Sequence, residues 1–476
     1  MTIDEVARKR RHRNERIAAT VLVTVLLIAL VIFVRWNREE EKELAKAKTY
    51  VPKVTPVSAE IALLREYVRI DTSNPPGTNQ LAGARWLSKI LQSEGVAVEL
   101  IESGPGRANV YARIRGRNRG DGLLLLHHID VVPVHPKQWE HPPFGGEIKL
   151  DMLYGRGTLD MKGIGICHLR AFLDVAKSKR APEHDLVFLA VVDEETGSAG
   201  GVPWLLEHRP DVFEGIRYAL NEGGITELVG EKVLYFGIEI GAKNETIVDV
   251  AAPRIEQLQA MRIGLEPYFV RREPQRVLPE VRRLFREQAQ TRMQYGTLLA
   301  DIDKTIAAGD FWRLPPGYRE LTQNDLGVDV ARASGDHFLA TVRLMNLPDQ
   351  DPDERLRWLE KTIAPFGVRV ATVRQKQPAT PLSSPETPLF SLIAREARRE
   401  YGSPAGTEIL FKEQNDSRFL RARGMTCYGL WPFPVDVFQT QSIHQSNERV
   451  RLDWFDQGVR LTRRVVALWA YPAPPN

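Results

Sequence analysis

Short, wholly apolar runs that alternate with helix-like stretches are the feature that most restricts the fold of this chain. Three of them are Leu123–Leu126, Leu186–Val192 and Tyr218–Leu220, each bounded by polar residues. Runs of this length suit strands that are buried on both faces, as in parallel sheets covered by helices. Together with a strand-like segment at Asn109–Ile114, they predict an α/β domain with a mainly parallel sheet.

The pattern changes between residues 241 and 366, where charged helical stretches surround the strand-like Phe338–Leu344. Beyond this region the alternation resumes, with the helical Thr387–Tyr401 and a final amphipathic helix around Trp454–Leu468. A chain of 476 residues is long enough for two or three domains. We therefore expect a second, α+β domain inserted into the first domain.

The N-terminal region contains an uncharged apolar run from Ile17 to Val34, about the shortest length that crosses a bilayer as a helix. A buried helix is one alternative, and a cleaved signal peptide is the more serious one, because basic residues precede the run. The residues after Phe33 offer no cleavage site with small side chains, which favours a permanent transmembrane helix. The preceding basic residues favour a cytoplasmic N-terminus, with the following domains periplasmic or extracellular.

Composition narrows the possible partners. The formal net charge of +4 comes from 65 basic and 61 acidic residues, a balance that argues against nucleic-acid binding. Cys167 and Cys427 are the only cysteines and neither belongs to a CxxC pair, so a disulfide framework and a thiolate metal site are both disfavoured. The predicted organisation is a basic cytoplasmic tail at 1–16, a transmembrane helix at 17–35, a linker at 36–55, an α/β domain at 56–240 and 367–476, and the inserted domain at 241–366.

Polar residues that suit metal chemistry follow the three apolar runs. His128 and Asp130 come after the first run, Glu194 and Glu195 after the second, and Glu222 after the third. Open α/β sheets place their ligand sites beyond the carboxyl ends of the strands. Each group alone also suits an ordinary surface turn, but together they predict a site at one edge of the sheet.

The residue types indicate what such a site would bind. Because a strand alternates its faces, His128 and Asp130 point the same way, and an acid two residues on suits a metal-bound imidazole. Asp160 follows a glycine-rich turn at the start of a helix, where it could bridge two metals. Carboxylates with imidazoles suit zinc, or less often cobalt or manganese, in a hydrolytic site. Of the adjacent acids Glu194 and Glu195, one can bind metal while the other moves protons.

Further short motifs accompany these residues in a fixed order. The whole set is His128–Pro133, Trp139, Pro143-Phe144, Tyr154–Gly157, Asp160–Gly163, Asp193–Glu195, Asn415–Phe419 and Ile443–Glu448. This order resembles the signature of the M20 family of metallopeptidases, especially its carboxypeptidase S and aminoacylase branch, which includes N-fatty-acyl-amino-acid hydrolases. The resemblance covers most of the chain from about residue 58 onward, with weak matching in the inserted domain.

The resemblance implies the M20 fold and a site for two zinc ions, with Co²⁺ or Mn²⁺ as substitutes. It implies that Asp160 bridges both ions and that the remaining ligands are His128, Glu195, Glu222 and His444. Position 221, where relatives often carry Asp, is Asn here, so Glu222 is the only carboxylate offered at that point.

The resemblance also implies roles for residues beside the metals. Asp130 would orient His128, and Glu194 would be the general base that takes a proton from water and passes it to the leaving amine. Arg418 is a candidate clamp for a substrate carboxylate, with a salt bridge to a nearby acid as the alternative. Arg343 would match a substrate-contacting arginine of the lid.

The inserted domain departs from the family pattern. Relatives carry a histidine early in the lid that stabilises the tetrahedral intermediate, whereas Ile247–Arg254 contains none. His337 is the only histidine in residues 241–366. It could compensate, or it could be a partly exposed structural residue.

Together these features predict a metal-dependent hydrolase that cleaves an amide bond in small peptides or N-acyl amino acids. The alternative is a catalytically weakened binding or regulatory protein of the same fold, displayed on a membrane. The tract around Trp431 to Pro434, with Phe438, could line an apolar acyl pocket, or could simply pack in the core. By resemblance, the lid could also mediate a homodimer.

Overall fold

The computed structural model describes residues 55–77, 79–178, 180–270, 275–290, 295–402, 405–410 and 414–472. The predicted tail, the predicted transmembrane helix at 17–35 and nearly all of the linker lie outside these residues and stay predictions, as does the homodimer. Within the described ranges, no helix combines the length and the apolar character needed to cross a bilayer. Apart from Leu228–Lys232, the described residues belong to one compact unit, residues 53–227 and 233–476.

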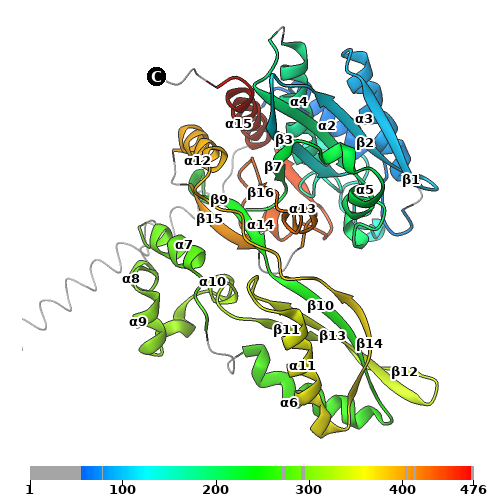
Figure 1. Ribbon diagram of the computed structural model, residues 1–476, viewed down its shortest axis with the longest axis vertical. Coiled ribbons are helices and arrows are strands. Elements are labelled where there is room, and N and C mark those ends of the chain that lie inside the picture. Colours follow the sequence, from blue (N-terminus) through cyan, green and yellow to red (C-terminus); the bar gives the residue numbers. More distant parts are fainter. Residues whose placement is uncertain are drawn as a thin grey trace, which may run out of the picture. The chain divides into compact units, whose positions relative to one another are not determined.

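The larger sheet has the strand order β1-β2-β6-β3-β7-β16-β9-β15 (Figure 1). Its centre is parallel, because β3 pairs in parallel with both β6 and β7, and β7 pairs in parallel with β16. The prediction of an α/β domain with a mainly parallel sheet is therefore confirmed. The strands are β1 (Val98–Gly104), β2 (Arg107–Ile114), β3 (Asn118–His128), β6 (His184–Val191), β7 (Ile216–Asn221), β9 (Lys232–Ala242), β15 (Ala405–Leu410) and β16 (Thr426–Leu430).

Helices bury both faces of this sheet, which explains why its central strands contain wholly apolar runs such as Leu123–Leu126 and Leu186–Val191. Leu123 and Leu125 of β3 pack into one apolar cluster, whereas Leu124 and Leu126 pack into another on the opposite face. The first cluster is completed by α2 (Ala59–Val68), α3 (Gln80–Ser93), α4 (Lys162–Lys177), α12 (Pro388–Tyr401) and α15 (Leu452–Ala470), and the second by α5 (Val202–His208) and α13 (Ser417–Arg421).

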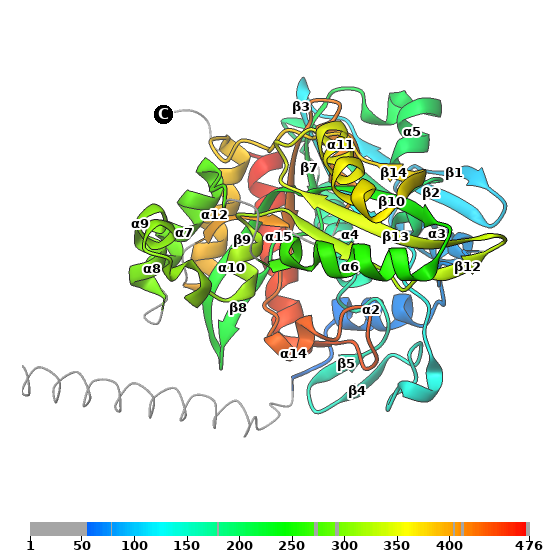
Figure 2. The ribbon, with the colours of Figure 1, turned by 90° about the horizontal axis from the view of Figure 1, so that it is seen from below.

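A second, antiparallel sheet has the strand order β11-β13-β10-β14 (Figure 1), and Figure 2 shows its strands β13, β10 and β14 from another side. Val248 and Val250 of β10 pack with the helices α6 and α11, so the residues that alternate with them, Glu245 and Ile247, face the other side. The elements are β10 (Asn244–Ala252), α6 (Ile255–Val270), β11 (Asp325–Val328), β12 (Arg332–Ser334), β13 (His337–Asn346), α11 (Pro352–Ile363) and β14 (Arg369–Lys376).

Two features of the insertion differ from the predicted lid. Its sheet continues past residue 366, because β14 completes it, and the largely exposed side chains of β14 give no apolar alternation from which to recognise that strand. The helices between α6 and β11 form a separate apolar cluster that includes Tyr235 of β9 and Leu382, so they pack against the first sheet. They are α7 (Pro279–Ala289), α8 (Gly296–Ala300), α9 (Ile302–Ala307) and α10 (Pro316–Glu320).

A small antiparallel sheet in the order β17-β5-β4 joins the end of the chain to its middle. Arg449 pairs with Tyr154, which brings the last motif beside the glycine-rich turn. Its strands are β4 (Glu147–Lys149), β5 (Met152–Tyr154) and β17 (Arg449–Arg451), and the remaining described elements include β8 (Thr226–Val229) and α14 (Val437–Thr440).

The ion pair between Arg421 and Glu239 offers a test of how the two parts of the first domain are joined. Arg421 Nη2 lies 2.8 and 2.9 Å from the two carboxylate oxygens, and both side chains are buried. We expect Arg421→Met to lower the free energy of unfolding by about 3–5 kcal/mol, because a buried carboxylate loses its counter-charge. Thermal unfolding of the purified protein measures this as a lower Tm.

The double variant Arg421→Met/Glu239→Met is expected to recover much of the loss, since neither charge is then left alone. Arg423→Met, at an exposed position nearby, is the matched control. An Arg421→Met protein that melts with the wild type would contradict the role of this ion pair.

Candidate metal centre

Three neighbouring strands deliver acids and a histidine to one edge of the larger sheet. His128 is the last residue of β3, and Glu222 directly follows β7. Glu194 and Glu195 lie in a 3-10 turn, η2 (Glu194–Thr196), just beyond the end of β6. Because β3 pairs in parallel with both β6 and β7, the carboxyl ends of the three strands meet there.

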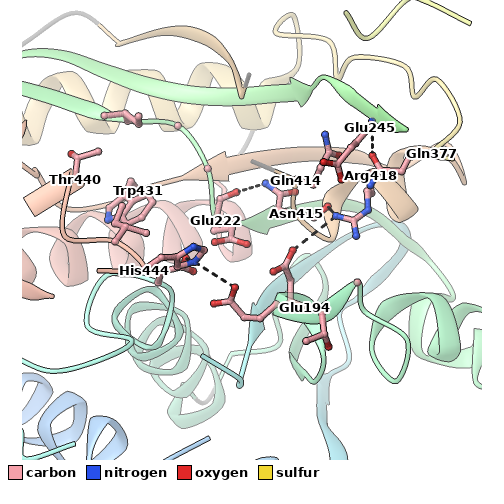
Figure 3. A pocket seen from close by; sticks show the side chains of 18 of the residues that line it. Glu194, Glu222, Glu245, Gln377, Gln414, Asn415, Arg418, Trp431, Thr440 and His444 are labelled. Carbon is pink, nitrogen blue, oxygen red and sulfur yellow. Dashed lines mark hydrogen bonds and ion pairs between the residues drawn. The ribbon is translucent and has the colours of Figure 1, made fainter. Parts of the chain in front are cut away.

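Asp160 and His444 complete the cluster from outside the sheet. One Asp160 oxygen lies 3.0 Å from His128 Nε2, and the other lies 2.8 Å from His444 Nε2. Glu222 lies 3.8 Å from His128 Nε2, and Glu195 lies 3.4 Å from His444 Nε2. The Asp160 carboxylate is therefore placed between two imidazoles, with one oxygen towards each. Figure 3 shows His444, Glu222 and Glu194 around the same space.

The imidazole of His128 is oriented by the main chain. Its Nδ1 lies 2.9 Å from the carbonyl oxygen of Asp130 but 3.6 Å from the Asp130 carboxylate. A carbonyl can only accept, so Nδ1 carries a proton, and Nε2 is the ring atom that faces Asp160 and Glu222 and would bind a cation there. The Asp130 atom nearest to Nδ1 is thus its carbonyl oxygen, and the orienting role of Asp130 stays a prediction.

The buried carboxylate of Asp130 positions the acidic turn instead. It accepts the main-chain N–H groups of Glu194 and Glu195, each at 3.2 Å, and the side-chain amide of Asn74 at 2.9 Å. The same Asn74 amide also reaches Asp193 and lies 2.9 Å from Thr196 Oγ1. Asn74 has no motif around it that would have identified this role from the sequence.

Glu448 is a second anchor, which the motif analysis quoted without a role. Its completely buried carboxylate accepts the main-chain N–H groups of Gly157, Leu159 and Asp160 at 2.8–3.2 Å. It also pairs with the buried Arg156. The turn that presents Asp160 is therefore held by an acid from the end of the chain.

The donor set fits divalent cations. His128, Asp160 and Glu195 offer ligand atoms that all lie within 4.8 Å of one another, and so do His128, Glu194 and Glu222. Among the described residues, the buried Glu195 Oε1 has no hydrogen-bond partner. Glu194 is thus also within ligand distance, so distances alone allow it to be either a ligand or a base.

The electrostatics of the cluster also indicate a site for divalent cations. Burial raises the pKa of the Glu222 carboxyl to about 8, and the charge of Asp160 adds to this effect. Burial likewise raises the pKa of Glu194 and of Glu195, helped by Glu222 and by Asp160 respectively. Acids held this close in a buried site need added positive charge to ionise together, which two divalent cations would supply.

A cavity of about 570 Å³ opens over these acids. Its walls differ on either side of Glu222, with Trp431 and Thr440 on one side and Glu245, Gln377 and Arg418 on the other (Figure 3). Ile225, Val435 and Ile443 also line the pocket and, with Trp431, form its apolar wall. The second sheet contributes Ile247, Arg343 and Gln375. The lid strands therefore reach the pocket.

The position of Arg418 suits both of its predicted roles, a clamp for a substrate carboxylate and a salt bridge to a nearby acid. Its Nη1 donates to the carbonyl of Asn415 at 3.0 Å and lies 3.9 Å from Glu194 Oε1. Asn415 in turn donates to the carbonyl of Glu222 at 3.1 Å. The guanidinium is thus oriented towards the acids and lines the pocket.

The structure places two other groups away from the pocket. His337 lies at the start of β13, where its Nδ1 is 2.9 Å from Asp336 and its side chain is 39% exposed. Phe433 packs on Phe455 in the core, and Phe438 is 67% exposed on α14. Of the suggested acyl pocket, Trp431 is the aromatic residue that lines the cavity.

Comparison with known proteins finds relatives that match this chain over different shares of their length. Aminoacylase-1A of Rattus norvegicus is 25% identical over 437 residues, which is 87% of this chain and 97% of that protein. The N-fatty-acyl-amino acid synthase/hydrolase PM20D1 of Xenopus tropicalis is 23% identical over 354 residues, 69% of this chain and 68% of that protein. Other matches are partial: N-formyl-4-amino-5-aminomethyl-2-methylpyrimidine deformylase of Bacillus subtilis is 31% identical over 143 residues, 29% of this chain and 34% of that protein.

The fold is also similar to solved structures. The M20 family metallo-carboxypeptidase Sso-CP2 of Sulfolobus solfataricus superimposes with a TM-score of 0.67 at 18% identity, over 87% of this chain and 99% of that chain. The profile of the peptidase family M20/M25/M40 matches residues 124–468. That span is well over half of the chain and contains the whole candidate metal centre, so the predicted resemblance is confirmed and the chain belongs to peptidase family M20/M25/M40.

Proposed function

We propose that this chain hydrolyses the amide bond of N-acyl amino acids or small peptides with two divalent cations, zinc first among them. The observation that carries the proposal is a buried cluster of acids and imidazoles at one edge of the sheet, inside a pocket with an arginine on one side and apolar side chains on the other. The names of the rat and frog relatives, an aminoacylase and an N-fatty-acyl-amino acid synthase/hydrolase, support this substrate class.

The residues that would hold the cations are His128, Asp160, Glu195, Glu222 and His444. Bound there, the cations would acidify a water molecule and polarise the scissile carbonyl. Glu194 would act as general base, because it lines the same cavity and its main-chain N–H is held by Asp130. It would take the proton of the attacking water and return it to the leaving nitrogen.

The two walls of the pocket suggest how the substrate lies. Arg418 would bind the carboxylate of the amino-acid part, since a guanidinium can donate two parallel hydrogen bonds to it. The acyl part would then lie along Trp431, Val435 and Ile443 on the other side of the acids. Arg343, which is half exposed on the lid, would approach the substrate from the second sheet.

A second candidate function is a binding or regulatory protein of the same fold with weakened catalysis. The observation that favours it is that His444 is the only histidine among the described residues that line the pocket. The lid strands therefore add no imidazole to stabilise an oxyanion. Loss of one such donor costs about 100- to 1,000-fold in rate, which weakens an enzyme without abolishing its activity.

The first experiment is turnover of a panel of N-acyl amino acids and dipeptides by the zinc-loaded protein, beside Glu194→Gln. We expect activity in the wild type and a loss of at least about 100-fold in the variant, because the base is removed. Metal analysis separates the two roles of Glu194: a base variant keeps two ions per chain, whereas a ligand variant loses one. Two bound ions with no turnover across the panel would favour the binding protein.

Removal of the metals tests whether they belong to the folded protein. A chelator is expected to abolish turnover and to lower the Tm, because the ions bind the folded chain and not the unfolded one. Added Zn²⁺ should restore both. Activity that survives exhaustive chelation, verified by metal analysis, would refute metal dependence.

The proposed carboxylate clamp predicts a selective defect in Arg418→Gln. We expect kcat/KM for an N-acyl amino acid to fall by about 100-fold, since a desolvated charge pair is lost. The same variant should lose much less on the corresponding amino-acid amide, which has no carboxylate. Arg423→Gln, at an exposed position, is the matched control. Equal losses on the acid and the amide would contradict the clamp.

A further inference from the structure

The lid wall of the pocket carries an acid that the proposed reaction does not use. Glu245 and Ile247 lie on the face of β10 that points away from α6 and α11. Ile247 pairs with Arg343 on one neighbouring strand and with Gln375 on the other, which places these side chains in one row across the sheet. All four residues line the pocket.

The carboxylate of Glu245 is only loosely paired. Arg343 Nη1 lies 3.6 Å from one oxygen, and Gln375 Nε2 lies 3.4 Å from the other. The Glu245 side chain is 16% exposed, whereas Arg343 is 50% exposed and reaches towards solvent. Burial raises the pKa of Glu245, and the charges of Arg343 and Arg418 oppose this shift. The acid therefore keeps capacity to accept hydrogen bonds and lies within the field of Arg418.

Gln377 places a donor beside this acid. The side-chain Oε1 of Gln377 accepts the main-chain N–H of Glu245 at 3.0 Å. The main-chain N–H of Gln377 donates to the Glu245 carbonyl at 3.0 Å. The bond to Oε1 fixes the amide orientation, because a flipped amide would face the N–H of Glu245 with another N–H. The Nε2 end is buried and has no hydrogen-bond partner among the described residues, although Gln377 is only 8% exposed. A buried donor without a partner is costly unless a ligand supplies the acceptor.

Both groups lie on the side of the pocket where the amino-acid part would bind. Figure 3 shows Glu245 and Gln377 next to Arg418, on the opposite side of Glu194 and Glu222 from Trp431 and Thr440. If Arg418 takes the α-carboxylate, the side chain of the same amino acid is the part of the substrate within reach of the lid wall.

We propose that Glu245 and Gln377 form a specificity subsite for an amino acid whose side chain ends in a carboxamide. The carboxamide N–H would donate to Glu245, and its oxygen would accept from Gln377 Nε2. This inference rests on the proposed function and specifies the amino acid that the reaction releases.

Other side chains satisfy this subsite less well. A carboxylate of the same size would face the charge of Glu245 and is repelled. An apolar side chain would cover both polar groups without pairing either, which sites built for hydrogen bonding penalise. An ammonium group would pair with Glu245 but would leave the Gln377 donor without an acceptor.

The test compares three side chains of nearly equal size on the same acyl group: N-acyl-L-glutamine, N-acyl-L-glutamate and N-acyl-L-methionine. For the wild type we expect kcat/KM to be highest for glutamine and at least about tenfold lower for glutamate, the effect of about 1.4 kcal/mol. Glu245→Gln should reduce the glutamine-to-glutamate ratio by about tenfold. Glu360→Gln removes an exposed acid from α11 of the same lid and should leave that ratio unchanged.

Each remaining outcome decides the inference. A wild type that prefers glutamate or methionine overturns it, and so does a Glu245→Gln variant that slows all three substrates equally. If no compound is turned over, the proposed hydrolase fails, and calorimetric binding of the same compounds to zinc-loaded protein takes over as the test. A Kd for the glutamine compound at least tenfold below that for the glutamate compound then supports the subsite, and equal Kd values refute it.

Discussion

Two buried carboxylates, those of Asp130 and Glu448, fix the main chain of the loops that carry the acidic cluster. Asp130 accepts the main-chain N–H groups of Glu194 and Glu195, and Glu448 accepts those of the turn that ends at Asp160. Neither interaction uses the side chains that face the pocket, so the loops are fixed while their acids stay available to cations. Carboxylates that repel one another would otherwise move apart, and rigid support of this kind is what a metal site needs from the residues around it.

Much of this arrangement was readable from the sequence, because the strongest signals were strictly local. Wholly apolar runs predicted buried parallel strands, and the residues after each run predicted which side chains meet at the sheet edge. The role of the Asp130 carboxylate was missed because a residue that binds two main-chain N–H groups looks the same in a sequence as one that orients a ring. The role of Glu448 depends on a contact with a turn almost three hundred residues earlier, as its bond to Gly157 shows, and no local pattern encodes such a pairing. The extent of the lid sheet was missed because β14 exposes most of its side chains.

The residues that line the pocket come from the larger sheet and from the lid sheet, and the two groups differ in how strongly the core fixes their positions. The larger sheet supplies Glu194, Glu195 and Glu222 just beyond strand ends whose positions are set by the core, so the geometry of these acids has little freedom. The lid supplies Glu245, Ile247 and Arg343 from one face of a sheet whose other face is buried against helices. Substitutions on the pocket face of that sheet change chemistry without disturbing its core, which makes the lid the natural place for substrate preference to vary.

The position of β16 has a consequence for how this protein is made. β7 and β9 follow each other closely along the chain, yet β16 lies between them in the sheet and pairs with both. During synthesis, the edges of β7 and β9 that pair with β16 therefore stay unpaired until the region around residue 430 has left the ribosome. Exposed edges of this kind invite pairing with other chains, so the nascent protein is most vulnerable to aggregation while the insertion is being translated. His444 is translated later still, so the cluster of acids and imidazoles is complete only after residue 444 has been made.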